Sequence, residues 1–268
     1  MKIIDSHCHP QMDDYGDGRE QMIERNLQEG VFMIAVGASL NSSQEAIALA
    51  EKYENKIWAT VGCHPDEIGD NFNFEEFENL ADSKVIAIGE VGLDYFRTPE
   101  IEKRMKQGEI FRQFADLAKN KNLPLVLHVR NEKADLSPAC AGMAQAGKSA
   151  HDDMAKLLSG GMRGVAHSFT GTIDEAKKYL NLGFYLGFNG IITFANQYDE
   201  IVKYTPIEQI LLETDAPWLS PVPYRGQKNE PMRVMEVAMR VAELKNVEME
   251  ELIDICNQNA KKLFSIDF

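Results

Sequence analysis

The chain has 268 residues, of which 44% are hydrophobic and 26% are charged, and its formal net charge is −14 at pH 7. These proportions exclude a disordered chain, and the length suits either one α/β barrel or two small domains. The negative charge excludes a basic surface that coats nucleic acid, but it permits a nucleic-acid enzyme whose site carries its own cations.

Cysteine spacing and hydropathy indicate the cellular environment of the protein. The four cysteines, Cys8, Cys63, Cys140 and Cys256, are far apart and form no CxxC pattern, which favours a reduced chain over a disulfide scaffold. The opening residues MKIIDSHCHP lack the apolar stretch of a signal peptide, and no apolar run approaches 18 residues. We therefore expect a cytoplasmic protein that has no membrane partner.

Short β-branched runs alternate with longer helical patterns along the chain. Strand–helix alternation is typical of parallel βαβ units, and eight such strands predict a (β/α)8 TIM barrel, an α/β fold with one domain over 1–268. A doubly wound open sheet is the alternative, but no glycine-rich dinucleotide loop follows the first strand. The predicted strands are 2–5, 32–37, 57–62, 85–89, 124–129, 163–167, 184–189 and 210–213. The predicted helices include 21–28, 42–52, 100–119, 152–158, 173–180 and 196–204, with two more between 231 and 264.

The segment 131–149, NEKADLSPACAGMAQAGKS, departs from this alternation and is rich in alanine and glycine. It follows the fifth predicted strand, which places it on the C-terminal face of a barrel, where functional loops lie. We interpret it as an insertion within the single domain. It is either a tolerated surface loop or a lid that restricts the substrate.

Histidines and carboxylates stand at the predicted strand ends. His7 and His9 are two apart on the first strand, so both imidazoles point the same way. Because the carboxyl ends of barrel strands share one rim, polar residues at these ends converge. The converging set is His7, His9, His64, Glu90, His128, His167 and Asp215. His151, the remaining histidine, is interpreted as a surface or helix-start residue.

The converging set predicts a metal centre. Imidazole and carboxylate ligands without a thiolate suit Mg²⁺, Mn²⁺, Zn²⁺ or Fe. Six ligand candidates exceed what one ion usually takes, which predicts two divalent ions with Glu90 bridging them. Cys8 and Cys63 adjoin ligand candidates, but strand alternation turns them away, and we interpret them as small buried residues. Glu213 and Asp5 each precede a ligand by two residues, and we interpret them as support for the ligands.

The chain resembles the TatD-type metal-dependent deoxyribonucleases of the amidohydrolase superfamily. The resemblance covers essentially the whole chain and rests on motifs in the expected order: DSHCHP, VGCHPD, GEVGLDY, HVR, HSFTG, ETDAPWLSP, RGQKNEP and NAKKLF. It implies a (β/α)8 barrel that binds divalent metal and hydrolyses DNA phosphodiester bonds. It also implies that His7, His9 and Asp215 ligate one ion and that His128 and His167 ligate the second, with Glu90 near or between the two.

The resemblance extends to substrate contacts. It implies that His64 contacts substrate or phosphate. Arg130 shares the inward face with His128, and Arg225 lies with Lys228 and Asn229 in a loop similar to the family's substrate edge, so we expect both arginines to bind phosphate. Two features depart from the family pattern. Asp66 stands where a second histidine is common, and the segment 131–149 is longer than expected.

These observations predict metal-assisted hydrolysis with Asp215 as the general base and Glu90 as the carboxylate between the metals. Since the acidic exterior repels a long duplex, we expect a monomeric 3′-to-5′ exonuclease that prefers single strands or ends. Aromatic residues beside the ligand motifs would stack on bases or cap the barrel. Two alternatives stay open: a hydrolase of another ester, lactone or amide bond in the same barrel, and a non-catalytic binding protein. The aromatic residues are Tyr95, Phe96, Phe169 and Trp218.

Overall fold

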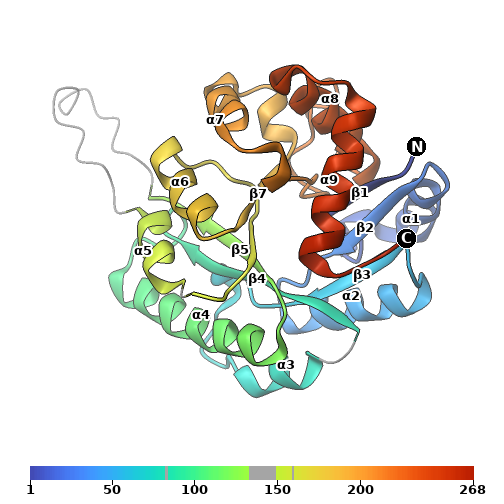
Figure 1. Cartoon of the computed structure of the whole chain (residues 1–268). Coiled ribbons are helices and arrows are strands. Elements are labelled where there is room, and N and C mark those ends of the chain that lie inside the picture. Colours follow the sequence, from blue (N-terminus) through green and yellow to red (C-terminus); the bar gives the residue numbers. More distant parts are fainter. Residues whose placement is uncertain (82–83, 133–148, 159) are drawn as a thin grey trace.

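The computed structural model describes residues 1–81, 84–132, 149–158 and 160–268. Within them, eight parallel strands pair in chain order to form the inner ring of a (β/α)8 barrel (Figure 1). The ring returns to its start where the backbone N–H of Asp215 donates to the carbonyl of His7 at 2.9 Å. All eight predicted strands are present. They are β1 (Ile3–Cys8), β2 (Val31–Ala35), β3 (Ile57–Val61), β4 (Val85–Asp94), β5 (Leu125–Arg130), β6 (Gly164–Ala166), β7 (Tyr185–Phe188) and β8 (Ile210–Leu212).

Helices surround the strands on the outside (Figure 1). Eight of the nine α-helices in the described residues match predicted segments; α3 was not predicted, because a seven-residue acidic stretch gives little helical periodicity. The side chain of Asn73 caps α3 by accepting from the Glu75 N–H. The helices are α1 (Arg19–Gln28), α2 (Leu40–Lys52), α3 (Phe74–Leu80), α4 (Ile101–Lys121), α5 (Ala150–Leu157), α6 (Ile173–Asn181), α7 (Asp199–Tyr204), α8 (Val234–Lys245) and α9 (Met249–Phe264).

One cluster of apolar side chains fills the barrel interior. Residues that alternate with it, such as Leu125 and Leu127 on β5, belong to a second cluster between the strands and the helices. The end of α9 joins the interior cluster through Leu263 and Phe264 and closes one end of the barrel. The strands contribute Ile4, Phe32, Ile34, Trp58, Ala87, Val126, Val165, Tyr185 and Leu211 to the interior cluster.

Polar side chains of the site stand one inward-facing position beyond the interior apolar cluster. On β5 and β8 the alternation is regular, so His128 follows Val126 and Glu213 follows Leu211 by two residues. On β1 and β4 the pairing register shifts, between Asp5 and Cys8 and between Ile88 and Val91. Such irregularities re-aim side chains beside active sites. They bring His7 and Glu90, each three residues after an interior apolar residue, into the same layer.

The surroundings of His151 differ from the expectation, and the segment 131–149 lies largely outside the described residues. His151 does lie at the start of α5, but it is buried rather than on the surface, because its ring packs against Phe169 and Tyr179. The proposed insertion at 131–149 falls almost wholly outside the described residues. No helix in the described part of the chain is long and apolar enough to cross a membrane.

Candidate metal centre

A cavity of about 610 Å³ lies at the carboxyl ends of the strands. His7 lies behind the cavity wall and is fully buried. Polar side chains from β4, from β5 and from the segments after β1, β3, β6 and β8 line this cavity, as the strand-end pattern predicts. Of the predicted site residues, the wall contains His9, His64, Glu90, His128, Arg130, His167 and Asp215.

The Glu90 carboxylate lies between two pairs of histidines. Its Oε1 is 2.7 Å from Nδ1 of His128 and 3.1 Å from Nε2 of His167. Its Oε2 is 3.5 Å from Nε2 of His7 and 3.8 Å from Nε2 of His9. Each oxygen thus faces one histidine pair, which is the arrangement that a carboxylate bridging two cations requires.

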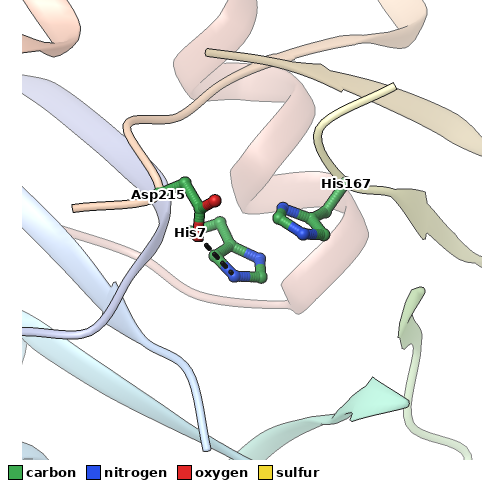
Figure 2. Close-up of side chains that lie close together, drawn as sticks. All are labelled: His7, His167 and Asp215. Carbon is green, nitrogen blue, oxygen red and sulfur yellow. Dashed lines mark ion pairs between the residues drawn. The ribbon is translucent and has the colours of Figure 1, made fainter. Parts of the chain in front are cut away.

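Asp215 completes the side of the site that holds His7 and His9. Its Oδ1 is 3.5 Å from Nε2 of His9 and 3.7 Å from Nε2 of His7. Figure 2 shows the His7 ring beside this carboxylate and the His167 ring across from it; the two rings stack with centroids 3.7 Å apart. The backbone of Asp215 has φ of +56°, a left-handed conformation that aspartate tolerates better than most residues.

Four histidines surround Glu90: His7, His9, His128 and His167. In three of them, the ring nitrogen that faces away from the site contacts a hydrogen-bond acceptor. Nδ1 of His9 donates to the carbonyl of Val36 at 2.8 Å. Nδ1 of His167 lies 3.2 Å from Glu213 Oε1, and Nε2 of His128 lies 3.1 Å from Asp94 Oδ2. Such an acceptor fixes the proton on the rear nitrogen and leaves the other nitrogen free to bind a cation.

Glu213 and Asp94 differ in how they relate to the sequence. Glu213 does support a site histidine, but the histidine is His167, directly after β6 and two strands away in the sheet, rather than the nearby Asp215. Asp94 was missed by sequence reasoning. Its signal was its place in the GEVGLDY motif, directly before the final tyrosine and four residues after Glu90, where it ends β4 next to β5.

Asp5 joins the ends of β1 and β8. Its Oδ1 accepts the backbone N–H groups of His7 at 3.3 Å and Thr214 at 2.9 Å, and its Oδ2 accepts the Thr214 hydroxyl at 2.5 Å. Burial raises the pKa of Asp5 well above its ordinary value. Asp5 therefore fixes the backbone that carries His7 and Asp215 relative to each other.

The electrostatics of the cluster suit a cation. Burial alone would raise the pKa of Glu90, but the neighbouring His167 and His128 outweigh it and hold the pKa well below its ordinary value. In the described residues, every ion pair of Glu90 and Asp215 is with a histidine and none is with lysine or arginine. In each of two groups, the potential ligand atoms lie within 4.8 Å of one another. The groups are His7, His9 and Glu90, and Glu90, His128 and His167. A divalent ion fits this set of imidazoles and ionised carboxylates.

His64 is oriented differently from the other site histidines. Its Nδ1 accepts the backbone N–H of Asp66 at 3.1 Å, so the neutral ring carries its proton on Nε2. That Nε2 points into the site, 3.2 Å from Nδ1 of His128 and 3.8 Å from Glu90 Oε1. Burial and the neighbouring His128 lower the pKa of His64 to about 3. The ring is thus a neutral hydrogen-bond donor at the edge of the cluster.

The predicted substrate residues fall into two groups. Arg130 lines the cavity, whereas Arg225 is exposed outside its wall and donates to the Ser220 carbonyl at 2.7 Å. Lys228 donates to the carbonyl of Asp14, away from the cavity. Asn229, expected at the substrate edge, is fully buried and holds the loop after β8 instead.

The aromatic residues beside the ligand motifs also divide. Tyr95 and Phe169 are buried and belong to the core. Phe96 and Trp218 are exposed, and Trp218 lines the cavity with its ring 5.2 Å from that of His9. Arg97, which sequence reasoning did not single out, also lines the cavity.

Comparison with known proteins places these features in context. A sequence model of the family described as TatD related DNase matches residues 4–265. The chain is 36% identical over 275 residues to YabD of Bacillus subtilis (strain 168), covering 99% of this chain and 100% of that protein. It is 34% identical over 274 residues to YcfH of Escherichia coli (strain K12), covering 100% and 97% respectively. Both proteins are described as uncharacterized metal-dependent hydrolases.

Solved structures are similar over the same length. The structure of YJJV, a TatD homolog from Escherichia coli K12, matches with a TM-score of 0.82 and 27% identity, covering 99% of this chain and 98% of that one. A hydrolase TatD family protein from Entamoeba histolytica matches with a TM-score of 0.79 at 22% identity, covering 98% of both chains, and shows the fold alone.

Proposed function

Because the chain belongs to the family of TatD-related DNases, we propose that it hydrolyses DNA phosphodiester bonds in the cavity at the carboxyl ends of the strands. The observation that carries the proposal is the Glu90 carboxylate, which presents one oxygen to each of two histidine pairs. Family membership supports a metal-dependent hydrolase. We propose its substrate, the direction in which it digests DNA and the ions that it binds.

Two divalent ions, Mg²⁺, Mn²⁺ or Zn²⁺, fit the donor set. His7, His9 and Asp215 would hold one ion, His128 and His167 would hold the other, and Glu90 would lie between them. When bound, such ions polarise the phosphate and lower the pKa of water, which supplies a nucleophile at neutral pH. Glu213 and Asp94 orient the histidines of the second ion through the hydrogen bonds described above.

The protein side chains supply the remaining steps. Asp215 accepts the proton of the attacking water. It is ionised beforehand because His9, His167 and His7 hold its pKa below the ordinary value against the effect of burial. His64 donates its Nε2–H to a phosphate oxygen, because its Nδ1 is occupied by the Asp66 N–H. Arg130 binds the phosphate backbone from the cavity wall.

The shape and charge of the molecule favour ends and single strands. The net charge of −14 repels a long duplex, while the ions and Arg130 make the cavity locally attractive. Trp218 is 45% exposed at the cavity wall and is available to stack on an unpaired base. Arg225 would contact a nucleotide beyond the cavity. Digestion from the 3′ end, a cytoplasmic location and a monomeric state stay predictions.

Hydrolysis of end-labelled single-stranded oligonucleotides tests the proposal. The protein would be assayed with Mg²⁺, with Mn²⁺ and with EDTA, beside Glu90→Ala, using labels on each end in parallel. Stepwise shortening from the 3′ end that EDTA and Glu90→Ala both abolish is the expected result. If metal-loaded protein cleaves no DNA, the proposal fails, and ester, lactone and amide substrates become the next to assay.

A further inference from the structure

The basic side chains of the cavity wall gather on one sector of the barrel. Within the described residues, the wall contains two of them, Arg97 after β4 and Arg130 at the end of β5. The wall also contains five carboxylates, Asp66, Glu67, Glu90, Asp94 and Asp215. Asp66 is already paired with Arg97, and Glu90 and Asp94 are already paired with His128. Among the described wall residues, a second anion beside the metal centre would therefore meet permanent positive charge at the two arginines of the β4–β5 sector.

Arg130 stacks on an aromatic ring and forms no ion pair with a carboxylate among the described residues. Its guanidinium carbon lies 3.9 Å from the centroid of the Phe96 ring, so the two planes stack. Across the described chain, no Asp or Glu lies within ion-pair distance of Arg130, although the side chain is half-buried. A planar cation that is already oriented, and whose guanidinium forms no ion pair with the described residues, suits a phosphate.

Arg97 lines the same cavity and is held by Asp66. Nη1 of Arg97 lies 3.0 Å from Asp66 Oδ2, and the backbone N–H of Arg97 donates to Asp94 Oδ1 at 2.8 Å. Asp66 is the residue that departs from the family's third-strand motif. In this chain its carboxylate fixes a cation at the cavity mouth, and the Arg97 side chain is still 62% exposed.

We propose that Arg97 and Arg130 form a binding site for a second phosphate of the substrate, next to the one that is cleaved. The inference deepens the proposed function and rests on it. Neither arginine is within ion-pair distance of Glu90 or Asp215, so both lie farther out than the histidines that surround the reacting phosphate. The preferred substrate is thus an oligonucleotide with a further phosphate, rather than a lone diester.

Calorimetric binding to the metal-loaded protein tests the site without turnover. The ligands are three dithymidines joined by an uncharged methylphosphonate: one with a 5′-phosphate, one with a 3′-phosphate and one with neither. We expect one terminal phosphate to tighten binding by about tenfold, the equivalent of one charge-assisted contact. Arg97→Gln and Arg130→Gln should each reduce this advantage to less than about threefold. Arg112→Gln, which removes an exposed charge on α4, should keep it.

The possible outcomes distinguish failure of the second-phosphate site from failure of the proposed DNase activity. Equal binding of all three ligands by the unaltered protein, or a full advantage in both cavity variants, would overturn the second-phosphate site. Hydrolysis of the end-labelled oligonucleotides, measured in parallel on the metal-loaded protein, reports on the DNase activity. If no oligonucleotide is cleaved while the binding advantage depends on Arg97 and Arg130, the anion site stands and the proposed DNase activity fails. Lysine at either position should restore part of the advantage, which distinguishes lost charge from lost folding.

Discussion

Glu213 Oε1 lies 3.2 Å from Nδ1 of His167, on the side of the ring that faces away from Glu90. The same oxygen accepts the backbone N–H of Ser168 at 2.6 Å, and the whole carboxylate is buried. Its position depends on Gly187 of β7, where any Cβ would overlap the carboxylate. Three adjacent strands, β6, β7 and β8, thus determine which nitrogen of His167 faces the metal centre.

Replacing Glu213 by glutamine should weaken metal binding. The amide keeps the shape of the side chain but removes the negative charge behind His167, and loss of such partners commonly costs about 10–100-fold in metal affinity. Titration calorimetry with Mn²⁺ measures the effect directly. Glu208→Gln removes an exposed carboxylate before β8 and is the matched control. Unchanged Mn²⁺ affinity in Glu213→Gln would show that the contact does not tune the metal centre.

Adding one methyl group at Gly187 should disturb the same contact between Glu213 and His167. In Gly187→Ala the new Cβ forces the Glu213 carboxylate away, and overpacking of this kind costs about 1–3 kcal/mol of unfolding free energy. Urea denaturation measures the loss, and Mn²⁺ affinity should fall with it. Gly108→Ala is the control, because its Cβ would meet only Leu157 at 4.0 Å within α4. A Gly187→Ala protein as stable as the unaltered one would contradict the close fit.

Asn229 should prove to be an anchor of the Asp215 loop. Its Nδ2 donates to the carbonyls of Thr214 at 3.0 Å and Trp218 at 2.6 Å, and its backbone N–H donates to Pro217. Asn229→Ala leaves the buried Thr214 carbonyl and the part-buried Trp218 carbonyl without these partners, which should lower the unfolding free energy by about 2–4 kcal/mol. Urea denaturation measures it, beside Asn120→Ala on the exposed face of α4. Equal stability of the two variants would rule out the anchoring role.

The barrel was predictable because its signals are local and repeated. Each strand is a short apolar run, and the alternation of strands and helices recurs along the chain. The site histidines were predictable for a related reason. On β5, His128 follows Val126 by the two residues that the strand repeat requires, so its inward direction could be read from the sequence.

Other features depend on contacts that no local pattern contains. The register shifts on β1 and β4, which turn His7 and Glu90 inward, arise from pairing with neighbouring strands. Asp94 and Asn229 are functional or structural through partners distant in the sequence, His128 and Thr214. A polar residue in a motif looks the same in sequence whether it faces substrate or anchors a loop. Asn229 was therefore expected at the substrate edge and is instead buried.

His151 gives the structure a source of acid sensitivity outside the metal centre. Its Nδ1 lies 3.0 Å from the Tyr179 hydroxyl. Burial lowers the pKa of His151 to about 4, although the nearby Glu175 and Asp152 act in the opposite direction and His128 and Lys178 act with burial. In the unfolded chain the pKa returns to about 6.5. Between these values the unfolded state binds a proton that the folded state does not, so stability falls as the pH falls from 6.5 towards 4.

Replacing His151 by glutamine should remove this part of the acid sensitivity. Because the pKa of His151 is about 4 in the folded protein and about 6.5 in the unfolded chain, His151 costs about 2 kcal/mol of stability between pH 7 and pH 5. Urea midpoints of the two proteins at pH 7, 6 and 5 measure the difference. His151→Gln is expected to be less stable at pH 7, because it alters a buried contact with Tyr179, but its curve should be flatter by that amount. Site carboxylates and histidines titrate in both proteins and cancel in the comparison. Parallel curves would place the acid sensitivity elsewhere, with the paired carboxylates and the histidines around Glu90.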